Sequence, residues 1–226
     1  MRHLKLFENF EDINSICKEY NIENYTINSD GTIDVNGDVR IFKKGGSKVI
    51  PLRFGKVTGY FMCDNNKLTS LEGCPKEVGG DFHCSDNKLR SLEGCPSSVG
   101  GNFICVRNKL VSLRGCPNKV NSFLCSSNSL RSLEGCPEVF DDFCCDDNKL
   151  LSLDGCPKEL IGEFRCSNNQ LTSLRGGPNS VGSHFDCRYN QLRSLEGCPK
   201  VGDDLYCQNN QLISLSILPQ SLLRLY

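Results

Sequence analysis

The sequence predicts a β-rich solenoid, in which one short structural unit is stacked on itself many times. The first observation is a unit of 20 or 21 residues that recurs eight times from Phe61 onward. The second is that every unit opens on a large apolar residue and carries an asparagine at the same place. A fixed period of this size is typical of a repeat protein whose units bury their apolar faces against one another. The units open at Phe61, Phe82, Phe103, Phe123, Phe143, Phe164, Phe185 and Leu205, and the asparagines are Asn66, Asn87, Asn108, Asn128, Asn148, Asn169, Asn190 and Asn210.

Each unit begins with a Phe-x-Cys segment, which we expect to be a short strand that pairs in parallel with its counterparts. Because side chains alternate along a strand, Phe and Cys point into the core and the residue between them points outward. Eight or nine strands at about 4.8 Å spacing form a sheet about 40 Å wide. The asparagine bends the chain out of the strand, and its buried amide is expected to hydrogen-bond backbone groups that would otherwise lack partners.

The return to the next strand is too short for a helix with its turns. It has about ten residues, and a ten-residue helix would leave none for the turns at its two ends. It also contains a proline, which lacks a backbone donor and interrupts a helix. We therefore expect extended, polyproline-like or single-turn 3₁₀ structure in the returns.

The unit resembles the leucine-rich repeat, whose pattern is apolar-x-apolar-x-x-Asn-x-Leu, with Phe and Cys here in the first two apolar places. The last unit, 205–226, is similar to the short repeats of bacterial effector proteins. The earlier units, with Gly-Cys-Pro as at 73–75, resemble leucine-rich-repeat proteins of tailed bacteriophages and bacteria. The resemblance implies an arc with a parallel sheet on its concave face. It also implies a scaffold that binds a protein partner, such as a host defence component.

The residues before the repeats are expected to cap the solenoid. Residues 4–20 carry apolar residues at helical spacing, and 25–27 and 32–35 form a predicted β-hairpin. Residues 39–41 resemble a degenerate first repeat strand. We therefore divide the chain into an N-terminal cap of helix and hairpin, residues 1–41, and a leucine-rich-repeat solenoid, residues 42–226. The cap would shield the open apolar end of the stack; a separate binding helix is the alternative.

At the C-terminal end, Leu222, Leu223 and Leu225 look like a final, incomplete strand without a cap. An edge strand offers unpaired backbone groups to another chain. A structural or self-assembling role, with a homo-oligomer formed through this end, is therefore the alternative to binding a different protein.

The sixteen cysteines fall mostly into two columns, one in the inward strand position and one after the glycine of each return. Free thiols acting as small buried apolar side chains are the favoured interpretation of both columns. Zinc binding and disulfides between stacked repeats are the alternatives; the chain has no Cys-x-x-Cys pair, and in-register side chains point the same way. Cys144 differs because it takes an outward position, where Asp142, Asp146 and Asp147 would raise the pKa of its thiol.

Composition favours neither catalysis nor nucleic-acid binding. The formal net charge is −1, and the sequence shows no membrane-spanning run and no secretion signal. We therefore expect a cytoplasmic protein, in the host cytoplasm if a phage encodes it, that contacts neither nucleic acid nor membrane. No Ser/His/Asp or metal-binding arrangement accompanies His3, His83 or His184. No catalytic residue, cofactor or metal is predicted, and the expected function is non-catalytic binding of a protein partner.

Two groups of outward residues are predicted to contact that partner. Scattered apolar residues without function are the alternative for both. The first group is aliphatic and rimmed by charge, as expected of an interaction site: Met62, Ile104, Val106, Arg107 and Leu124. The second contains residue types enriched at binding hot spots: Arg165, Arg188, Tyr189 and Tyr206.

Overall fold

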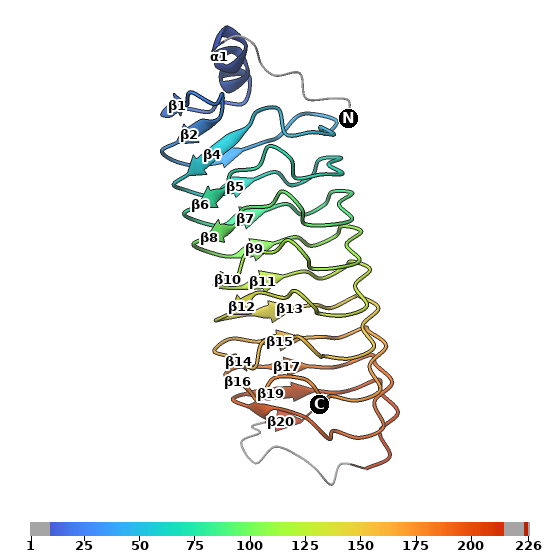
Figure 1. Ribbon diagram of the computed structural model, residues 1–226. Coiled ribbons are helices and arrows are strands. Elements are labelled where there is room, and N and C mark those ends of the chain that lie inside the picture. The colour runs from blue at the N-terminus through green and yellow to red at the C-terminus, as the bar shows by residue number, and fades with distance from the viewer. Residues whose placement is uncertain (1–9, 215–223, 226) are drawn as a thin grey trace.

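The computed structural model describes residues 10–214, 224 and 225, which form an elongated stack of repeats (Figure 1). One α-helix, α1 (Phe10–Glu19), lies at the N-terminal end, and the other regular elements of these residues are short β-strands. Residues 20 or 21 apart in sequence are neighbours in the stack, as Phe123 and Phe143 or Phe61 and Phe82 are. The predicted β-solenoid is confirmed.

The Phe-x segments form one parallel sheet, whose outward side we call the strand face. Neighbouring strands pair in register, so the inward Phe residues from Phe61 to Phe185 stand side by side, and Phe185 stands beside Leu205 of the last repeat. The pairing extends beyond the eight strands that open the repeats, to one further strand at each end. Within the described part of the chain the sheet has ten strands: β3 (Val39–Arg40), β5 (Phe61–Met62), β7 (Phe82–His83), β9 (Phe103–Ile104), β11 (Phe123–Leu124), β13 (Phe143–Cys144), β15 (Phe164–Arg165), β17 (Phe185–Asp186), β19 (Asp204–Tyr206) and β20 (Arg224–Leu225).

The returns form further parallel ladders, which were not predicted. No 3₁₀-helix occurs in residues 10–214, so the extended alternative is the one observed. The ladder is interrupted between β8 and β10 and between β12 and β14. Its strands are β4 (Phe54–Val57), β6 (Glu77–Val78), β8 (Ser98–Val99), β10 (Lys119–Val120), β12 (Glu138–Val139), β14 (Glu159–Leu160), β16 (Ser180–Val181) and β18 (Lys200–Val201).

A tight turn precedes the proline in the seven returns between Leu71 and Pro199. The Leu71 carbonyl accepts a hydrogen bond from the Cys74 backbone N–H at 3.0 Å, and Gly73 between them has a φ of 96°. This is a type II turn, whose third residue needs a positive φ that glycine adopts without strain. The turn explains why a glycine stands two residues before these prolines.

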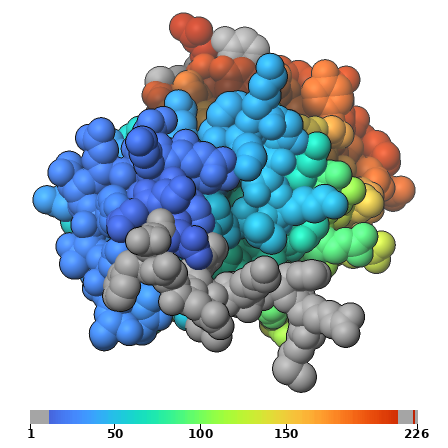
Figure 2. Space-filling view, turned by 90° about the horizontal axis from the view of Figure 1, so that it is seen from above, coloured from blue at the N-terminus to red at the C-terminus, as the bar shows by residue number. Residues whose placement is uncertain are grey.

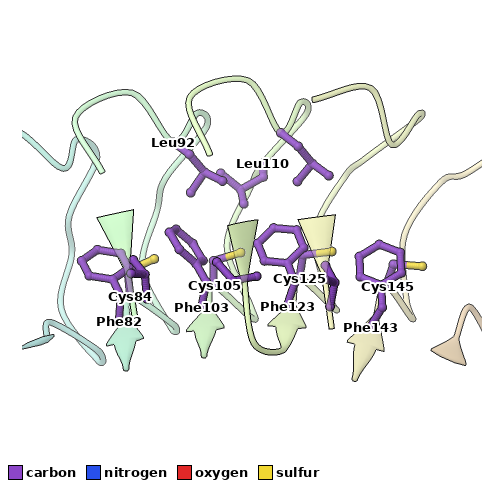
Figure 3. Close-up of a cluster of buried hydrophobic side chains, with 14 of the residues drawn as sticks. Phe82, Cys84, Leu92, Phe103, Cys105, Leu110, Phe123, Cys125, Phe143 and Cys145 are labelled. Atoms are coloured by element: carbon purple, nitrogen blue, oxygen red, sulfur yellow. The ribbon is translucent and has the colours of Figure 1, made fainter. Parts of the chain in front are cut away.

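The core lies between the strand sheet and the returns and consists of stacked columns of like side chains (Figure 3). In Figure 3 the rings of Phe82, Phe103, Phe123 and Phe143 stand in a row, each with a cysteine beside it. The ring centroid of Phe123 lies 5.5 Å from that of Phe103 and 6.0 Å from that of Phe143. Aromatic contacts at this separation add to the free energy gained from burying the rings.

Each repeat asparagine bonds the backbone of its own repeat and of the preceding one. Nδ2 of Asn128 donates to the carbonyls of Cys105, Cys125 and Ser126 at 3.0–3.2 Å. Its Oδ1 accepts the backbone N–H of Leu110 at 2.9 Å. The same pattern is found at the other repeat asparagines. The predicted role of the buried amide is confirmed.

The N-terminal residues cover the end of the stack. Ile13 and Cys17 of α1 join the core, and β1 (Tyr25–Ile27) and β2 (Ile33–Val35) form the predicted antiparallel hairpin. Figure 2 looks onto this end and shows blue and light-blue atoms over much of it, with the orange and red repeats behind. Both ladders cross the predicted boundary at residue 41, because β2 pairs with β4 and β3 pairs with β5.

Parts of two predicted elements lie outside the described residues. The helix predicted over 4–20 is described from Phe10, and Leu222 and Leu223 are not described. Leu225 belongs to β20, where it pairs with Leu205 as the predicted final strand requires. No helix in the described ranges has the length and apolar character needed to cross a membrane.

All sixteen cysteines lie in the described part of the chain, where no disulfide joins them. The inward strand column belongs to the hydrophobic core, as predicted. Burial raises the pKa of the Cys84 and Cys125 thiols well above the ordinary value, and raises that of Cys95 and Cys198 to about 12. No group of three or more His, Cys, Asp or Glu side chains within residues 10–214 is placed to hold a metal ion.

We expect thiol reagents to react very slowly with the folded protein at neutral pH. The thiolate is the attacking species, and a raised pKa leaves little of it. Ellman's reagent should titrate all sixteen thiols in denaturant. In buffer the half-buried Cys95, Cys116, Cys136 and Cys198 should react first, as located by mass spectrometry. Rapid labelling of the inward column in the native protein would contradict the buried arrangement.

Candidate partner-binding surface

The middle residues of the Phe-x-Cys segments form a continuous row on the strand face. Except for Cys144 and Asp186, which are buried, they are half-buried or exposed, so strand alternation placed the row correctly. Register pairing sets each beside its counterpart in the next repeat, in the order Met62, His83, Ile104, Leu124, Cys144, Arg165, Asp186 and Tyr206.

The centre of the predicted aliphatic group is contiguous. Ile104 and Leu124 are register partners on β9 and β11. Val106 follows Ile104 by two positions, which puts it on the same side of the chain. All three side chains are half-buried, so each leaves apolar surface open to a partner. We call Ile104, Val106 and Leu124 the aliphatic patch.

Met62 is separated from the aliphatic patch by His83 and belongs to a different feature. It lines a hollow of about 310 Å³ at the N-terminal end of the strand face. This hollow was not predicted, because half of its lining comes from a segment that precedes the regular repeats. The other lining residues are Arg40, Ile41, Phe42, Asp64 and Asn65.

The three predicted arginines are held in ion pairs with carboxylates of the strand face. Paired guanidinium groups are fixed in direction and share their charge with the carboxylate. The Arg107 guanidinium accordingly lowers the pKa of Asp86. These arginines therefore present ordered, largely neutralised groups to a partner. The pairs are Arg107–Asp86, Arg165–Asp146 and Arg188–Asp186, with N···O distances of 2.5, 3.2 and 2.6 Å.

The two predicted tyrosines differ in their settings. The Arg188 guanidinium lies 5.2 Å from the centroid of the Tyr206 ring, and the Tyr206 hydroxyl donates to Asp204 at 3.2 Å. Tyr189, by contrast, exposes 55% of its surface. Tyr206 is therefore part of a polar network, whereas Tyr189 offers an open aromatic side chain.

Arg107 and Tyr189 also share a backbone conformation that was not predicted. The residue before each repeat asparagine has a φ of 51–59°, although none is glycine. Asn and Asp tolerate this left-handed region, whereas it costs other residues about 1 kcal/mol or more. The abundance of Asn and Asp at this position was the available sequence signal. Because all eight repeats share this conformation, it belongs to the turn that ends each strand and does not distinguish Arg107 and Tyr189 from their counterparts.

Cys144 is buried although it takes an outward position, and the expectation that it is exposed there is wrong. Its small side chain is covered on the strand face, with Sγ 3.6 Å from Oε1 of Glu163. Its pKa is raised, as predicted. Burial is the largest cause, followed by Glu163 and Asp146, so loss of water rather than the neighbouring carboxylates dominates.

The stack is similar to a solved structure described as YopM from Yersinia enterocolitica WA-314. The TM-score is 0.46 and the sequence identity 17%, over 84% of this chain and 52% of that chain. The chain thus spans about half the length of the structure that it matches. No family model matches the sequence, and no curated protein matches it significantly. The repeat geometry itself therefore defines the fold, a leucine-rich-repeat-like β-solenoid with an N-terminal helix.

Proposed function

We propose that the protein is a non-catalytic module that binds a protein partner through the strand face, with the aliphatic patch at the centre of the contact. One observation carries the proposal: half-buried Ile104 and Leu124 are register partners on adjacent strands, half-buried Val106 follows Ile104 by two positions, and most of the surrounding surface is polar. Apolar surface rimmed by charge favours association, because contact removes it from water.

The dimensions of the strand face suit a protein. Its ten described strands, at about 4.8 Å spacing, extend for roughly 45 Å along the stack. A stable protein–protein interface buries about 800 Å² of accessible surface on each partner. The Phe and Asn columns hold the sheet in one shape, which limits the entropy lost on binding. Arg107, Arg165, Arg188, Tyr189 and Tyr206 would supply the polar and aromatic surround.

We further propose that the partner is a host protein and that binding blocks it. The support is the resemblance of the Gly-Cys-Pro repeats to proteins of bacteriophages and bacteria, for which a host defence component is a suitable target. A cytoplasmic location is part of the proposal, since sixteen free thiols suit a reducing compartment. The proposed contact uses no cofactor, nucleic acid or membrane.

Self-association is the alternative function. Among the described residues, β20 is the last strand of the sheet and pairs with β19 on one side. A strand at the edge of a sheet can pair with a second copy of the chain. Sedimentation velocity over a concentration series tests this alternative: a defined oligomer supports it, and a monomer throughout removes it.

The double variant Ile104→Asp/Leu124→Asp should lose the partner in affinity purification from the native host. The substitutions remove two apolar side chains from the centre of the contact and place carboxylates, which must lose their bound water, against apolar side chains of the partner. We therefore expect an affinity loss of roughly a hundredfold or more. The substituted side chains already contact water, so the variant should melt near the wild-type temperature.

The matched control is Val111→Asp/Leu151→Asp, which adds the same charges on the rim that follows the strands. These two aliphatic residues expose 61% and 60% of their surface. The control should retain the partner. Equal recovery of the partner with both double variants would rule out the aliphatic patch as the binding site.

A further inference from the structure

We infer that the segment received by the strand face is basic: a Lys/Arg-rich stretch of a protein partner that also carries apolar side chains for the aliphatic patch. This inference rests on the proposed function and adds the chemistry of the partner. It depends on how charge is distributed between the strand face and the rest of the chain.

The strand face has four outward columns in the eight repeats: the residue before the inward Phe, the middle residue, and the two residues after the inward Cys. Three arginines stand in these columns, at 107, 165 and 188, against nine acidic residues, a formal charge of −6. The whole chain carries −1, so the other residues together carry +5. The acidic residues are Asp64, Asp81, Asp86, Asp142, Asp146, Asp147, Glu163, Asp186 and Asp204.

Side-chain contacts show that the column before the Phe belongs to this surface. Glu163 lies 3.6 Å from Sγ of Cys144 and 3.7 Å from Nη1 of Arg165. Asp204 accepts the hydroxyl hydrogen bond of Tyr206, and Asp81 lies 3.8 Å from Nε2 of His83. In each case a carboxylate contacts a middle residue of the strand face. Its negative charge therefore contributes to the electrostatic potential of that face.

The arginines leave part of this negative charge uncompensated beside the aliphatic patch. Asp142 and Asp147 flank Cys144, which is the register partner of Leu124. Asp142 accepts the backbone N–H of Glu163, and Asp147 accepts a side-chain hydrogen bond from Asn168. No Lys or Arg in the described part of the chain forms an ion pair with either carboxylate. A cationic side chain of the partner can therefore bind these carboxylates without displacing a lysine or arginine of this chain.

Positive charge is found on the rim instead. Lys67, Lys88, Lys109 and Lys149 each follow a repeat asparagine and are exposed. A basic partner is repelled by this rim and attracted by the strand face, so the charge pattern orients it during approach. The aliphatic patch then supplies the apolar contact that charge alone does not provide.

The experiment uses two fluorescent synthetic peptides, one with lysines and arginines around a central Leu-Phe pair and one with glutamates in their place. Fluorescence anisotropy measures their binding to the full chain over a series of salt concentrations. The basic peptide should bind, more weakly as salt rises, and at least about tenfold more tightly than the acidic one.

Two triple variants separate the local charge from the net charge. Asp142→Asn/Asp147→Asn/Glu163→Gln neutralises the strand face and keeps the hydrogen-bond acceptors. Glu72→Gln/Glu93→Gln/Glu134→Gln makes the same change of charge at exposed residues of the returns. The first variant should weaken binding of the basic peptide by roughly tenfold or more, and the second by less than about threefold.

Equal binding of the two peptides, or equal effects of the two triple variants, would overturn the inference. If the basic peptide fails while Ile104→Asp/Leu124→Asp still loses the native partner, only the basic chemistry is wrong. If that double variant keeps the native partner, the proposed binding site is wrong as well.

Discussion

Replacing Asn128 by alanine is expected to lower the free energy of unfolding by roughly 3–5 kcal/mol. The substitution removes three donated hydrogen bonds and one accepted hydrogen bond. Most of these bonds are buried, and they join two repeats, so the backbone groups left behind lack water as a substitute partner. Denaturant unfolding followed by circular dichroism measures the loss.

Two further variants isolate the cause. Asn118→Ala removes an exposed asparagine from a return and should change stability by less than about 0.5 kcal/mol. Asn128→Asp keeps the acceptor but turns a second oxygen toward three carbonyls, which should raise the pKa of the new carboxyl above about 3.9. The protonated carboxyl can donate a hydrogen bond to these carbonyls, whereas the carboxylate cannot. The loss in free energy of unfolding relative to wild type should therefore be smallest at low pH and grow as pH rises through that raised pKa. A loss for Asn128→Ala as small as that for Asn118→Ala would contradict the proposed role.

Phe123→Ala is expected to cost roughly 3–5 kcal/mol and to divide the stack into two units that unfold separately. The Phe123 ring is fully buried between the rings of Phe103 and Phe143. Each repeat contacts chiefly its neighbours, so a cavity in the middle weakens the coupling between the two halves. Hydrogen exchange measured by mass spectrometry should show faster exchange centred on β11 and different unfolding free energies on its two sides.

Phe140→Ala provides a matched control from the same repeat. Phe140 exposes 54% of its surface, so the same substitution leaves no cavity and should cost less than about 0.5 kcal/mol. Similar losses for both variants would mean that the phenylalanine column does not dominate the core. A single cooperative transition for Phe123→Ala would contradict the nearest-neighbour picture.

Much of the fold could be predicted because the repeat gives each position a clear periodic signal. Phe123 and Cys125 alternate with Leu124, which identifies the inward and outward sides of a strand without knowledge of its neighbours. The side-chain amide of a buried Asn128 needs hydrogen-bond partners, and at a bend of the chain the nearby partners are mostly backbone groups. The same local logic identified the helix and hairpin at the N-terminal end, and the row that contains the aliphatic patch.

The sequence by itself thus determined the repeat period, the inward columns and the residues that point outward from the sheet, because these depend on alternation within one unit. The tertiary structure decided which outward residues remain available. Arg165 is paired and Cys144 is covered because carboxylates of adjacent repeats, 19 residues away in the sequence, come within contact distance. Tyr189 stays exposed, with 55% of its surface open. The acidic character of the strand face arises in the same way, since stacking gathers onto one surface the charges that the linear sequence spreads over eight repeats.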